Sequence, residues 1–314
     1  RIANRFDLGG TNCVVDAACA SSLSAVHLAA LELSAGRVDM AITGGMDTFN
    51  DIFMYMCFSK TPALSPTGNS RPFAKEGDGT ILGEGLGAVI LKRLEDAERD
   101  GDKVYAVLKG MGSSSDGKGN AIYAPSAEGQ TKALWNAYRE ADVTPRSIEL
   151  VEAHGTGTSV GDAVEAKALS GVYSQDNEDE TWCAVGSVKS MIGHTKAAAG
   201  VAGLIKTAMA LKYKVIPPSI KVDEPLEIIN PGTAPIYLNS VKRPWLKTLS
   251  TPRRAALSAF GFGGSNFHCV LEEAEETKTE IEWDGQVLII ALSADSKADL
   301  INQLPDAAVL ASAE

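Results

Sequence analysis

The sequence has few cysteines, no excess of positive charge and no long apolar run. Its 314 residues include five cysteines without a C-x-x-C pair, which argues against a disulfide framework and a zinc ribbon. Acidic residues outnumber lysine and arginine by 40 to 29, which argues against nucleic-acid and polybasic membrane binding. Apolar stretches such as 197–205 fall far short of the ~20 residues that span a bilayer, and the first residues show no signal-peptide run. We therefore expect a cytoplasmic, globular protein with no nucleic-acid or membrane partner.

Glycine is abundant instead, with 30 residues that stand where apolar runs end. Short apolar runs alternate with longer amphipathic ones, and this alternation predicts α/β layers. The predicted strands are 13–15, 40–43, 87–91, 104–108 and 148–153. The predicted helices are 22–35, 130–140 and 197–211.

Two charged stretches divide the chain into three predicted parts. The stretch at 94–102 separates a first half, residues 1–100, from a second half, residues 101–273. Residues 274–314 are assigned to an acidic linker and the start of a further module. In that last part, we expect a strand at 287–292 and a short helix, capped by Ser293, that ends before Pro305.

Cys19 is a candidate nucleophile because it lies at or near the N-terminus of a predicted helix. Unpaired N–H groups and the helix dipole stabilise a thiolate there, which predicts a lowered pKa for this cysteine. Its neighbours are small, so a substrate has room to approach. A buried structural cysteine would fit the same context. The other cysteines lie in apolar runs and are assigned to the core: Cys13, Cys57, Cys183 and Cys269.

Two of the four histidines, His154 and His194, stand in glycine-rich turns after predicted strands. Sites in α/β sheets gather at the carboxyl ends of strands, so both are candidates for catalysis, although a structural histidine also fits. His27 and His268 are assigned to packing. Cys19 and the two histidines share no i, i+3 or i, i+4 spacing, so we expect no metal site.

The glycine-rich segments do not match known nucleotide-binding patterns. The pair at 155–157 lacks the third glycine of a dinucleotide fingerprint, and the chain has no G-x-x-x-x-G-K-[ST] segment. The glycines at 261–264 require unusual backbone angles and would let backbone N–H groups approach a ligand closely. A tight turn is the alternative interpretation of this segment.

Four segments carry a resemblance when they are taken together and in order. They are VDAACASS at 15–22, EAHGTGT at 152–158, GSVKSMIGHT at 186–195 and SAFGFGGSN at 258–266. Residues 1–273 thereby resemble the β-ketoacyl synthase family, the condensing enzymes of fatty acid and polyketide synthesis. The segments at 71–94 and 54–62 are similar to the polyketide synthase and polyunsaturated fatty acid synthase branches. Family members usually carry Thr at position 18 and Ser at position 20, where this chain has alanine.

The resemblance implies a fold and a reaction. The fold would be a thiolase-like, duplicated α/β/α/β/α arrangement, with its first half incomplete in this chain. Cys19 would accept an acyl group, and a decarboxylative Claisen condensation with a malonyl-type extender would follow. His154 and His194 would stabilise the enolate. Lys189 would orient this site through an ion pair with Glu165.

The same resemblance implies the supporting groups. Asp162 would belong to the network of Lys189. Backbone N–H groups of Cys19 and Phe262 would form the oxyanion hole, and Phe262 would also gate the acyl chain. Thr156 and Thr158 would bind the phosphopantetheine arm. No cofactor would be bound, because phosphopantetheine arrives on an acyl carrier protein. Further implied partners are an adjacent acyltransferase module and a second copy in a homodimer.

Three alternatives stay open: a chain-length-factor-like partner that only shapes a cavity, a decarboxylase of the same fold, and a degradative thiolase. A thiolase would normally use a second cysteine near the end, where this chain has Asn266 and His268. At most one predicted strand precedes Cys19, and an open sheet would expose apolar faces and unpaired edges. We therefore expect residues 1–314 alone to be insoluble or inactive until an upstream segment completes the first sheet.

Overall fold

The computed structural model describes residues 1–118, 121–175, 180–229, 234–247, 251–274, 292–294 and 296–312. Contacts divide the chain into two compact units, Arg1–Ala274 and Glu275–Glu314. No helix within these described ranges is long and apolar enough to cross a bilayer.

In the second unit, helix α9 (Lys297–Ser312) begins after Ser296 rather than after the expected Ser293. The Ser296 Oγ accepts the Asp299 N–H at 3.2 Å and donates to the Asp299 carboxylate at 2.6 Å, so it caps the first turn. The helix also continues through Pro305, where we expected it to end, because the fixed φ of proline is compatible with a helix at the cost of one hydrogen bond. The predicted strand at 287–292 lies, apart from residue 292, outside the described residues.

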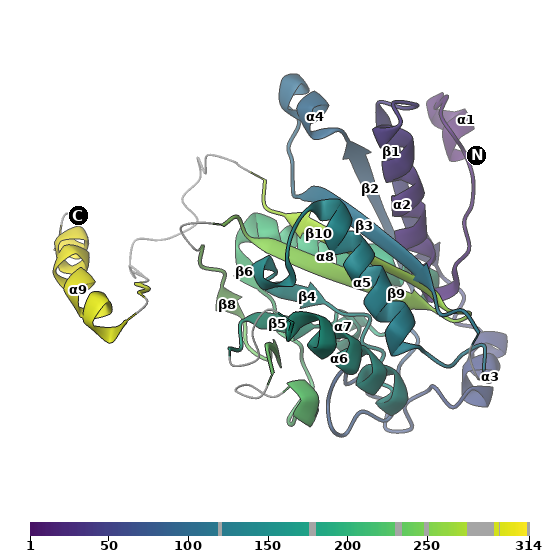
Figure 1. Cartoon of the computed structure of the whole chain (residues 1–314). Helices are drawn as coiled ribbons and strands as arrows, with labels where there is room; N and C mark the ends of the chain where they lie inside the picture. Colours follow the sequence, from purple (N-terminus) through teal and green to yellow (C-terminus); the bar gives the residue numbers. More distant parts are fainter. Residues whose placement is uncertain are drawn as a thin grey trace. The chain divides into compact units, whose positions relative to one another are not determined.

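A six-stranded sheet is the central layer of the first unit (Figure 1). In spatial order, its strands are β3 (Val107–Ser115), β10 (Ser265–Glu272), β9 (Arg254–Gly261), β4 (Leu150–Glu152), β5 (Cys183–Gly186) and β7 (Ile236–Leu238). The first three strands pair antiparallel, and β9, β4, β5 and β7 pair parallel. The parallel strands therefore end at one common edge, where the turns after them meet.

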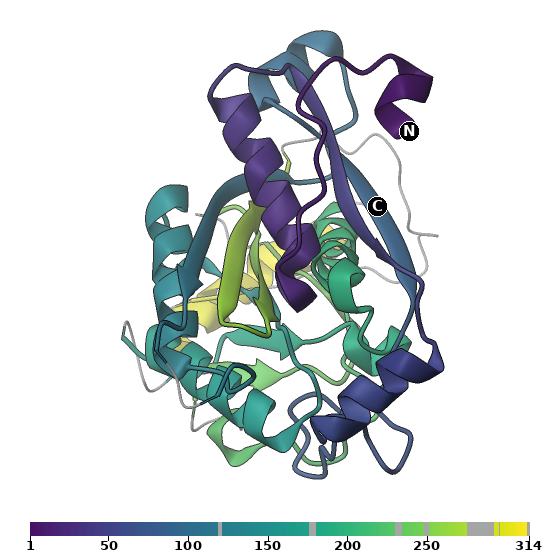
Figure 2. The ribbon, with the colours of Figure 1, turned by 90° about the vertical axis from the view of Figure 1, so that its right-hand side faces the viewer.

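Alternate residues of these strands supply two cores, one on each face of the sheet. Ala256 and Val270 belong to one buried cluster, together with helices α5 and α6. Leu257 and Leu271 belong to the other, together with α2 and α8. The four helices are α2 (Ser21–Ser34), α5 (Ala127–Ala141), α6 (Ser159–Tyr173) and α8 (Ala199–Tyr213). Helices thus cover both faces of the sheet (Figures 1 and 2).

A second, two-stranded sheet lies over α2 and α8 (Figure 2). It pairs β1 (Met40–Asp47) with β2 (Gly85–Lys92) in an antiparallel register. Val89 and Leu91 of β2 pack against the core on the α2 and α8 side. Five large apolar side chains are exposed on its outer face: Met40, Ile42, Met46, Leu86 and Ile90. The described layers therefore follow the order α/β/α/β.

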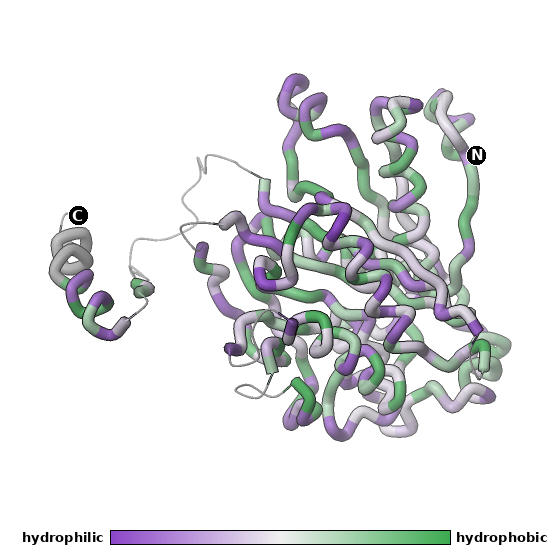
Figure 3. The backbone as a smooth tube through the Cα atoms, in the orientation of Figure 1, coloured by the Kyte–Doolittle hydropathy of each residue, from purple (hydrophilic) through white to green (hydrophobic). Residues whose placement is uncertain are grey.

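The remaining elements are short. They are α1 (Ile2–Phe6), α3 (Ile52–Lys60), α4 (Leu94–Asp100), α7 (Lys189–Ile192), β6 (Val215–Ile216), β8 (Arg243–Pro244) and four 3₁₀ turns, of which η1 (Ala18–Ala20) bears on the site. The charged stretch at 94–102 forms α4, a hydrophilic segment in Figure 3. The division of the first 273 residues into two halves stays a prediction.

Most predicted strands and helices are present with shifted ends, but the predicted strand at 13–15 is wrong. These residues have no regular structure, and Val14 is fully exposed, because no described strand lies beside them to pair with. Cys13 and Cys57, both predicted to be in the core, are exposed. Cys57 lies on α3, which buries none of its residues. Cys183 and Cys269, on central strands, are buried as predicted.

Candidate active site

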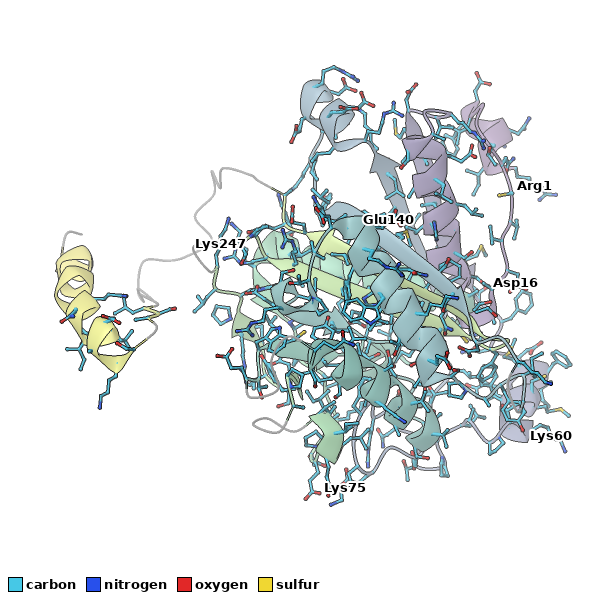
Figure 4. All side chains as sticks on the ribbon, in the orientation of Figure 1. Arg1, Asp16, Lys60, Lys75, Glu140 and Lys247 are labelled. Atoms are coloured by element: carbon cyan, nitrogen blue, oxygen red, sulfur yellow. The ribbon has the colours of Figure 1, made fainter. Side chains whose placement is uncertain are left out.

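Cys19 lies in the turn η1, immediately before α2, and is buried. Ala18 adopts a left-handed backbone conformation with φ 50°, which an L residue holds only when its surroundings fix it. Asp16, labelled in Figure 4, accepts the Ala18 N–H at 2.9 Å. The Ser21 hydroxyl donates to the Ala18 carbonyl at 2.7 Å and accepts the Ala17 N–H at 2.9 Å. These bonds hold Cys19 at the helix entrance, where the sequence predicted it.

The predicted lowering of the Cys19 pKa is wrong. Burial raises the pKa of this thiol above its ordinary value, because the thiolate loses its hydration. The charge of Lys189 and the backbone N–H groups of Phe262 and Cys19 act in the opposite direction without outweighing burial. The sulfur is therefore a protonated thiol at neutral pH, placed next to two N–H donors.

The two candidate histidines lie together. Their ring centroids are 5.5 Å apart, and the ring planes are nearly perpendicular at 84°. The Lys196 N–H donates to His194 Nδ1 at 3.0 Å, so the neutral His194 ring carries its proton on Nε2. Burial, followed by the positive charge of Lys189, holds the pKa of His154 and of His194 well below the ordinary value. Both imidazoles are therefore neutral near pH 7.

The direct ion pair expected between Lys189 and Glu165 is wrong. Among the described contacts, the Lys189 ammonium donates to the His154 carbonyl. The Glu165 carboxylate instead accepts the N–H groups of His154 and Gly155, each at 2.8 Å. Backbone groups at the end of β4 are thus interposed between the two charges. Burial lowers the pKa of Lys189, and the negative charges of Glu152 and Glu165 oppose that change.

Asp162 holds the glycine-rich turn after His154. Its carboxylate accepts the N–H of Phe73 at 2.7 Å and of Gly157 at 3.1 Å, and the Thr156 hydroxyl at 3.4 Å. Burial raises the pKa of Asp162 to about 6. Burial, with the charge of Asp162, also raises the pKa of Glu165. The two carboxylates position the backbone around His154 rather than contact its imidazole.

One cavity of about 340 Å³, a size within the range of small-molecule sites, brings most of the predicted site residues together, but Lys189 and Asp162 are not among its lining residues. Its lining includes Cys19, His154, His194, Thr156, Thr158 and Phe262. Phe262 is 47% exposed and stacks on Phe58 with ring centroids 6.3 Å apart. The Thr156 and Thr158 hydroxyls are 2.8 Å apart, and Thr158 also caps α6 by accepting the Gly161 N–H at 3.3 Å.

Lys196 is a site residue that the sequence did not reveal. It adopts a left-handed φ of 49°, and its buried ammonium bonds to the Asn50 side chain at 2.6 Å, the Gly83 carbonyl at 2.9 Å and Asp47 at 3.1 Å. These contacts fix the N–H that faces His194. The only sequence signal was its place two residues after His194. Within the described parts of the chain, no cluster of His, Cys, Asp and Glu could hold a metal ion.

Comparisons with known proteins agree with these observations. The family models described as beta-ketoacyl synthase, N-terminal domain, and beta-ketoacyl synthase, C-terminal domain, match residues 1–97 and 105–223. The chain is 48% identical over 312 residues to a polyunsaturated fatty acid synthase polypeptide from a Thraustochytrium species, covering 96% of this chain and 11% of that protein. It is 43% identical over 277 residues to the polyketide synthase GfsE of Streptomyces halstedii, and the match covers 88% of this chain and 7% of that protein.

The fold is also similar to solved structures. The ketosynthase from module 6 of the bacillaene synthase of Bacillus subtilis superposes with a TM-score of 0.85 at 41% identity, covering 87% of this chain and 50% of that one. An oxazolomycin ketosynthase domain from Streptomyces albus superposes with a TM-score of 0.84 at 35% identity, and the match covers 89% of this chain and 49% of that one. The predicted thiolase-like α/β fold is confirmed. The chain spans about half the length of these structures and about a tenth or less of the two synthases.

Proposed function

Because the chain belongs to the β-ketoacyl synthase family, we propose that it condenses a carrier-bound acyl group with a malonyl-type extender. The observation that carries the proposal is the shared cavity of Cys19, His154 and His194. A nucleophile beside backbone donors, opposite a pair of neutral imidazoles, suits acyl transfer followed by enolate chemistry.

In the first step, the Cys19 sulfur attacks the carbonyl carbon of an acyl thioester. The new S–C bond forms, the carrier sulfur leaves, and the thiol proton passes to that leaving sulfur. The N–H groups of Phe262 and Cys19, which already face the Cys19 sulfur, stabilise the oxyanion that develops on the carbonyl. Since burial favours the thiol over the thiolate, Cys19 gives up its proton as it attacks rather than beforehand.

In the second step, the bond between the extender and its carboxylate breaks. CO₂ leaves, and the electron pair of that bond forms an enolate. The enolate carbon attacks the acyl carbon, a C–C bond forms, and the Cys19 sulfur leaves as a thiolate that takes up one proton from water. His194, with its proton on Nε2, and His154 stabilise the enolate oxygen by hydrogen bonds. Burial, followed by the nearby positive charge of Lys189, keeps both rings neutral, and that charge also favours negative charge in the cavity.

The remaining site residues support this chemistry. Lys189 and Glu165 position the backbone at His154, and Asp162 holds the turn that carries Thr156 and Thr158. The two threonines bind the phosphopantetheine arm, whose amides suit hydroxyl partners. Phe262 is placed at the cavity with a partly exposed ring, which suits an acyl-chain gate.

The proposed partners are an acyl carrier protein bearing phosphopantetheine, an adjacent acyltransferase module and a second copy of the chain. The relatives are named as synthases and are many times longer than this chain, which supports a place within a larger assembly. Light scattering tests the homodimer, and a monomer at micromolar concentration contradicts it.

Intact-mass detection of an acyl group on Cys19 tests the function. We expect acyl-pantetheine to add one acyl mass to the wild-type protein and none to Cys19→Ala. A chain-length-factor-like protein gains no acyl group, and a decarboxylase releases CO₂ from the malonyl thioester without forming a condensed product. Either result contradicts the proposal. A hydroxylamine-sensitive acyl group on the Cys19→Ala variant contradicts the assignment of the nucleophile.

A further inference from the structure

The catalytic cavity contains a buried amide that the proposed mechanism does not use. Gln130 lines the cavity with Cys19, is 2% exposed, and its Oε1 accepts no hydrogen bond from the described residues. Burial of an amide without a partner is unfavourable, and an apolar side chain of similar volume would avoid that cost. A group of this kind at a cavity wall therefore indicates a partner in the ligand.

The place of Gln130 is fixed by its helix. It lies in the first turn of α5, where the Ser126 hydroxyl caps the Gly129 N–H at 3.3 Å. The Gly129 carbonyl accepts the Ser114 hydroxyl at 2.6 Å. A Cβ at Gly129 would lie 2.0 Å from the Asp116 carboxylate, so the helix touches the strand end without space to rotate.

The polar side chains beside Gly129, the residue before Gln130, are already paired with one another. Asn266 Nδ2 donates to Asp116 Oδ1 at 2.6 Å and lies 3.4 Å from the Ser114 hydroxyl. Asp116 and Asn266 also line the cavity, but their hydrogen bonds run between β3 and β10. Neither of these side chains donates a hydrogen bond to Gln130 Oε1.

A second buried group in the same cavity has the same property. Thr80 is 2% exposed, and its hydroxyl has no partner among the described residues. Its backbone is held between Ala63 and Ser65 by two hydrogen bonds of 2.8 Å. The Ser65 hydroxyl nearby bonds to Asp78 at 2.6 Å, so Thr80 differs from its neighbour in lacking a partner.

We infer that Gln130 and Thr80 form a polar subsite that binds an oxygen- or amide-bearing part of the thioester substrate. The inference rests on the proposed function. A carboxamide both donates and accepts, so its best ligand is a group that does the same: a hydroxyl on the acyl chain or an amide of the carrier arm. The cavity walls otherwise include Phe58, Ile122, Val160 and Phe260, which favour the hydrocarbon portion of the same substrate.

The test measures binding, so that it does not depend on turnover. Dissociation constants are determined by calorimetry for 3-hydroxyacyl and saturated acyl pantetheine of equal chain length, and for the matching S-propyl thioesters without amides. The background is Cys19→Ala, which prevents covalent capture. Gln130→Leu and Thr80→Val remove the proposed hydrogen bonds at nearly constant volume. Thr131→Val is the matched control, because Thr131 follows Gln130 on α5 but does not line this cavity.

We expect Gln130→Leu to weaken binding roughly 10-fold for either the two 3-hydroxyacyl ligands or the two pantetheine thioesters, while Thr131→Val leaves all affinities unchanged. If only the 3-hydroxyacyl ligands lose affinity, the partner of Gln130 is the hydroxyl of the acyl chain. If only the pantetheine thioesters lose affinity, the partner is an amide of the carrier arm. Equal affinities of Gln130→Leu and its parent for all four ligands overturn the inference and leave solvent as the partner of Gln130. If Gln130→Leu does not fold, the same comparison is made with Gln130→Met and Thr80→Val.

Failure of the proposed function gives a different pattern. A wild-type protein that binds these thioesters with the predicted preference but never acquires an acyl group contradicts the function and retains the subsite. Acylation of Cys19 without any effect of Gln130→Leu on affinity contradicts the subsite and retains the function.

Discussion

The backbone N–H of Lys196 donates to Nδ1 of His194 over 3.0 Å. A ring nitrogen that accepts a hydrogen bond carries no proton, so the single proton of the neutral imidazole is on Nε2. The left-handed backbone of Lys196, with φ 49°, directs its N–H back to the ring. In the proposed reaction, His194 therefore acts as a hydrogen-bond donor and not as a general base.

Substitution of His194 tests this role. We expect His194→Ala to retain acylation of Cys19 and to lose condensation about 100- to 1,000-fold, since one donor to a developing oxyanion is worth about 2.7–4 kcal/mol. His194→Gln should retain more condensation than His194→Ala, because its amide nitrogen can take the place of the Nε2 donor. Single-turnover acylation and product formation measure the two steps separately. Equal loss of both steps would indicate a general base or misfolding.

Removal of the nucleophile should separate decarboxylation from condensation. In Cys19→Gln, we expect CO₂ release from the malonyl thioester to persist or increase, while condensation disappears. The histidine pair and the N–H groups of Phe262 and residue 19 survive this change, and the glutamine amide occupies the place of an acyl group. Radiolabelled CO₂ release provides the measurement. If that release is lost in a folded variant, the division of labour between cysteine and histidines is wrong.

The pH at which Cys19 becomes reactive should lie above that of a free cysteine, whereas an activated cysteine has its midpoint shifted downward. Burial raises the pKa of this thiol, so its alkylation by iodoacetamide should be half-maximal at a pH above that of a free cysteine, ~8.5. Lys189→Met should move this midpoint further upward, because the ammonium favours the thiolate. Exposed Cys57 provides an internal control within the same digest. A midpoint below that of a free cysteine would contradict the effect of burial.

The sequence predicted the position of these groups better than their chemistry. Helix α2 could be predicted because Leu23, Val26 and Leu33 repeat at helical spacing, and this placed Cys19 at its start. The pKa of Cys19 could not, because it depends on burial by segments distant in the sequence. The expected pairing of Lys189 with Glu165 was wrong for a similar reason, since both charges found backbone partners near His154.

His268 should make the stability of the protein depend on pH. It is fully buried, and burial lowers its pKa to about 3, while Ser258 and the Tyr138 hydroxyl bond to its two ring nitrogens at 2.9 and 3.1 Å. A depressed folded-state pKa contributes stability above the unfolded pKa of ~6.5 that is lost as pH falls towards 3. When the pH falls from about 7.5 to about 5, we expect the free energy of unfolding of the wild type to decrease by about 2 kcal/mol more than that of His268→Gln.

Denaturant unfolding of both proteins at several pH values measures this difference. Asp162 acts in the opposite direction, since its raised pKa of about 6 gives stability that is lost as pH rises through that value, but it is common to both proteins. His268→Gln retains an amide for the Tyr138 bond, so the comparison isolates the titration. Parallel pH profiles would show that His268 takes up no proton on unfolding.

The close approach of α5 to β3 should be intolerant of a single methyl group. A Cβ at Gly112 would lie 2.1 Å from the Ala133 carbonyl and 2.3 Å from the Ala137 nitrogen, and these backbone atoms cannot move without displacing the helix. We expect Gly112→Ala to lower the free energy of unfolding by about 1–3 kcal/mol or more. The displaced helix carries Gln130, so binding of the thioester ligands should change as well.

Gly171→Ala is the matched control, because Gly171 lies within α6 and a Cβ there meets nothing within 4 Å. Helix propensity alone then decides the result, and alanine is favoured over glycine by about 0.5–1 kcal/mol. Denaturant titrations should therefore move the two midpoints in opposite directions from wild type. If Gly112→Ala were as stable as Gly171→Ala, α5 would have room to retreat from the sheet, and the fixed position of Gln130 at the cavity wall would be lost with it.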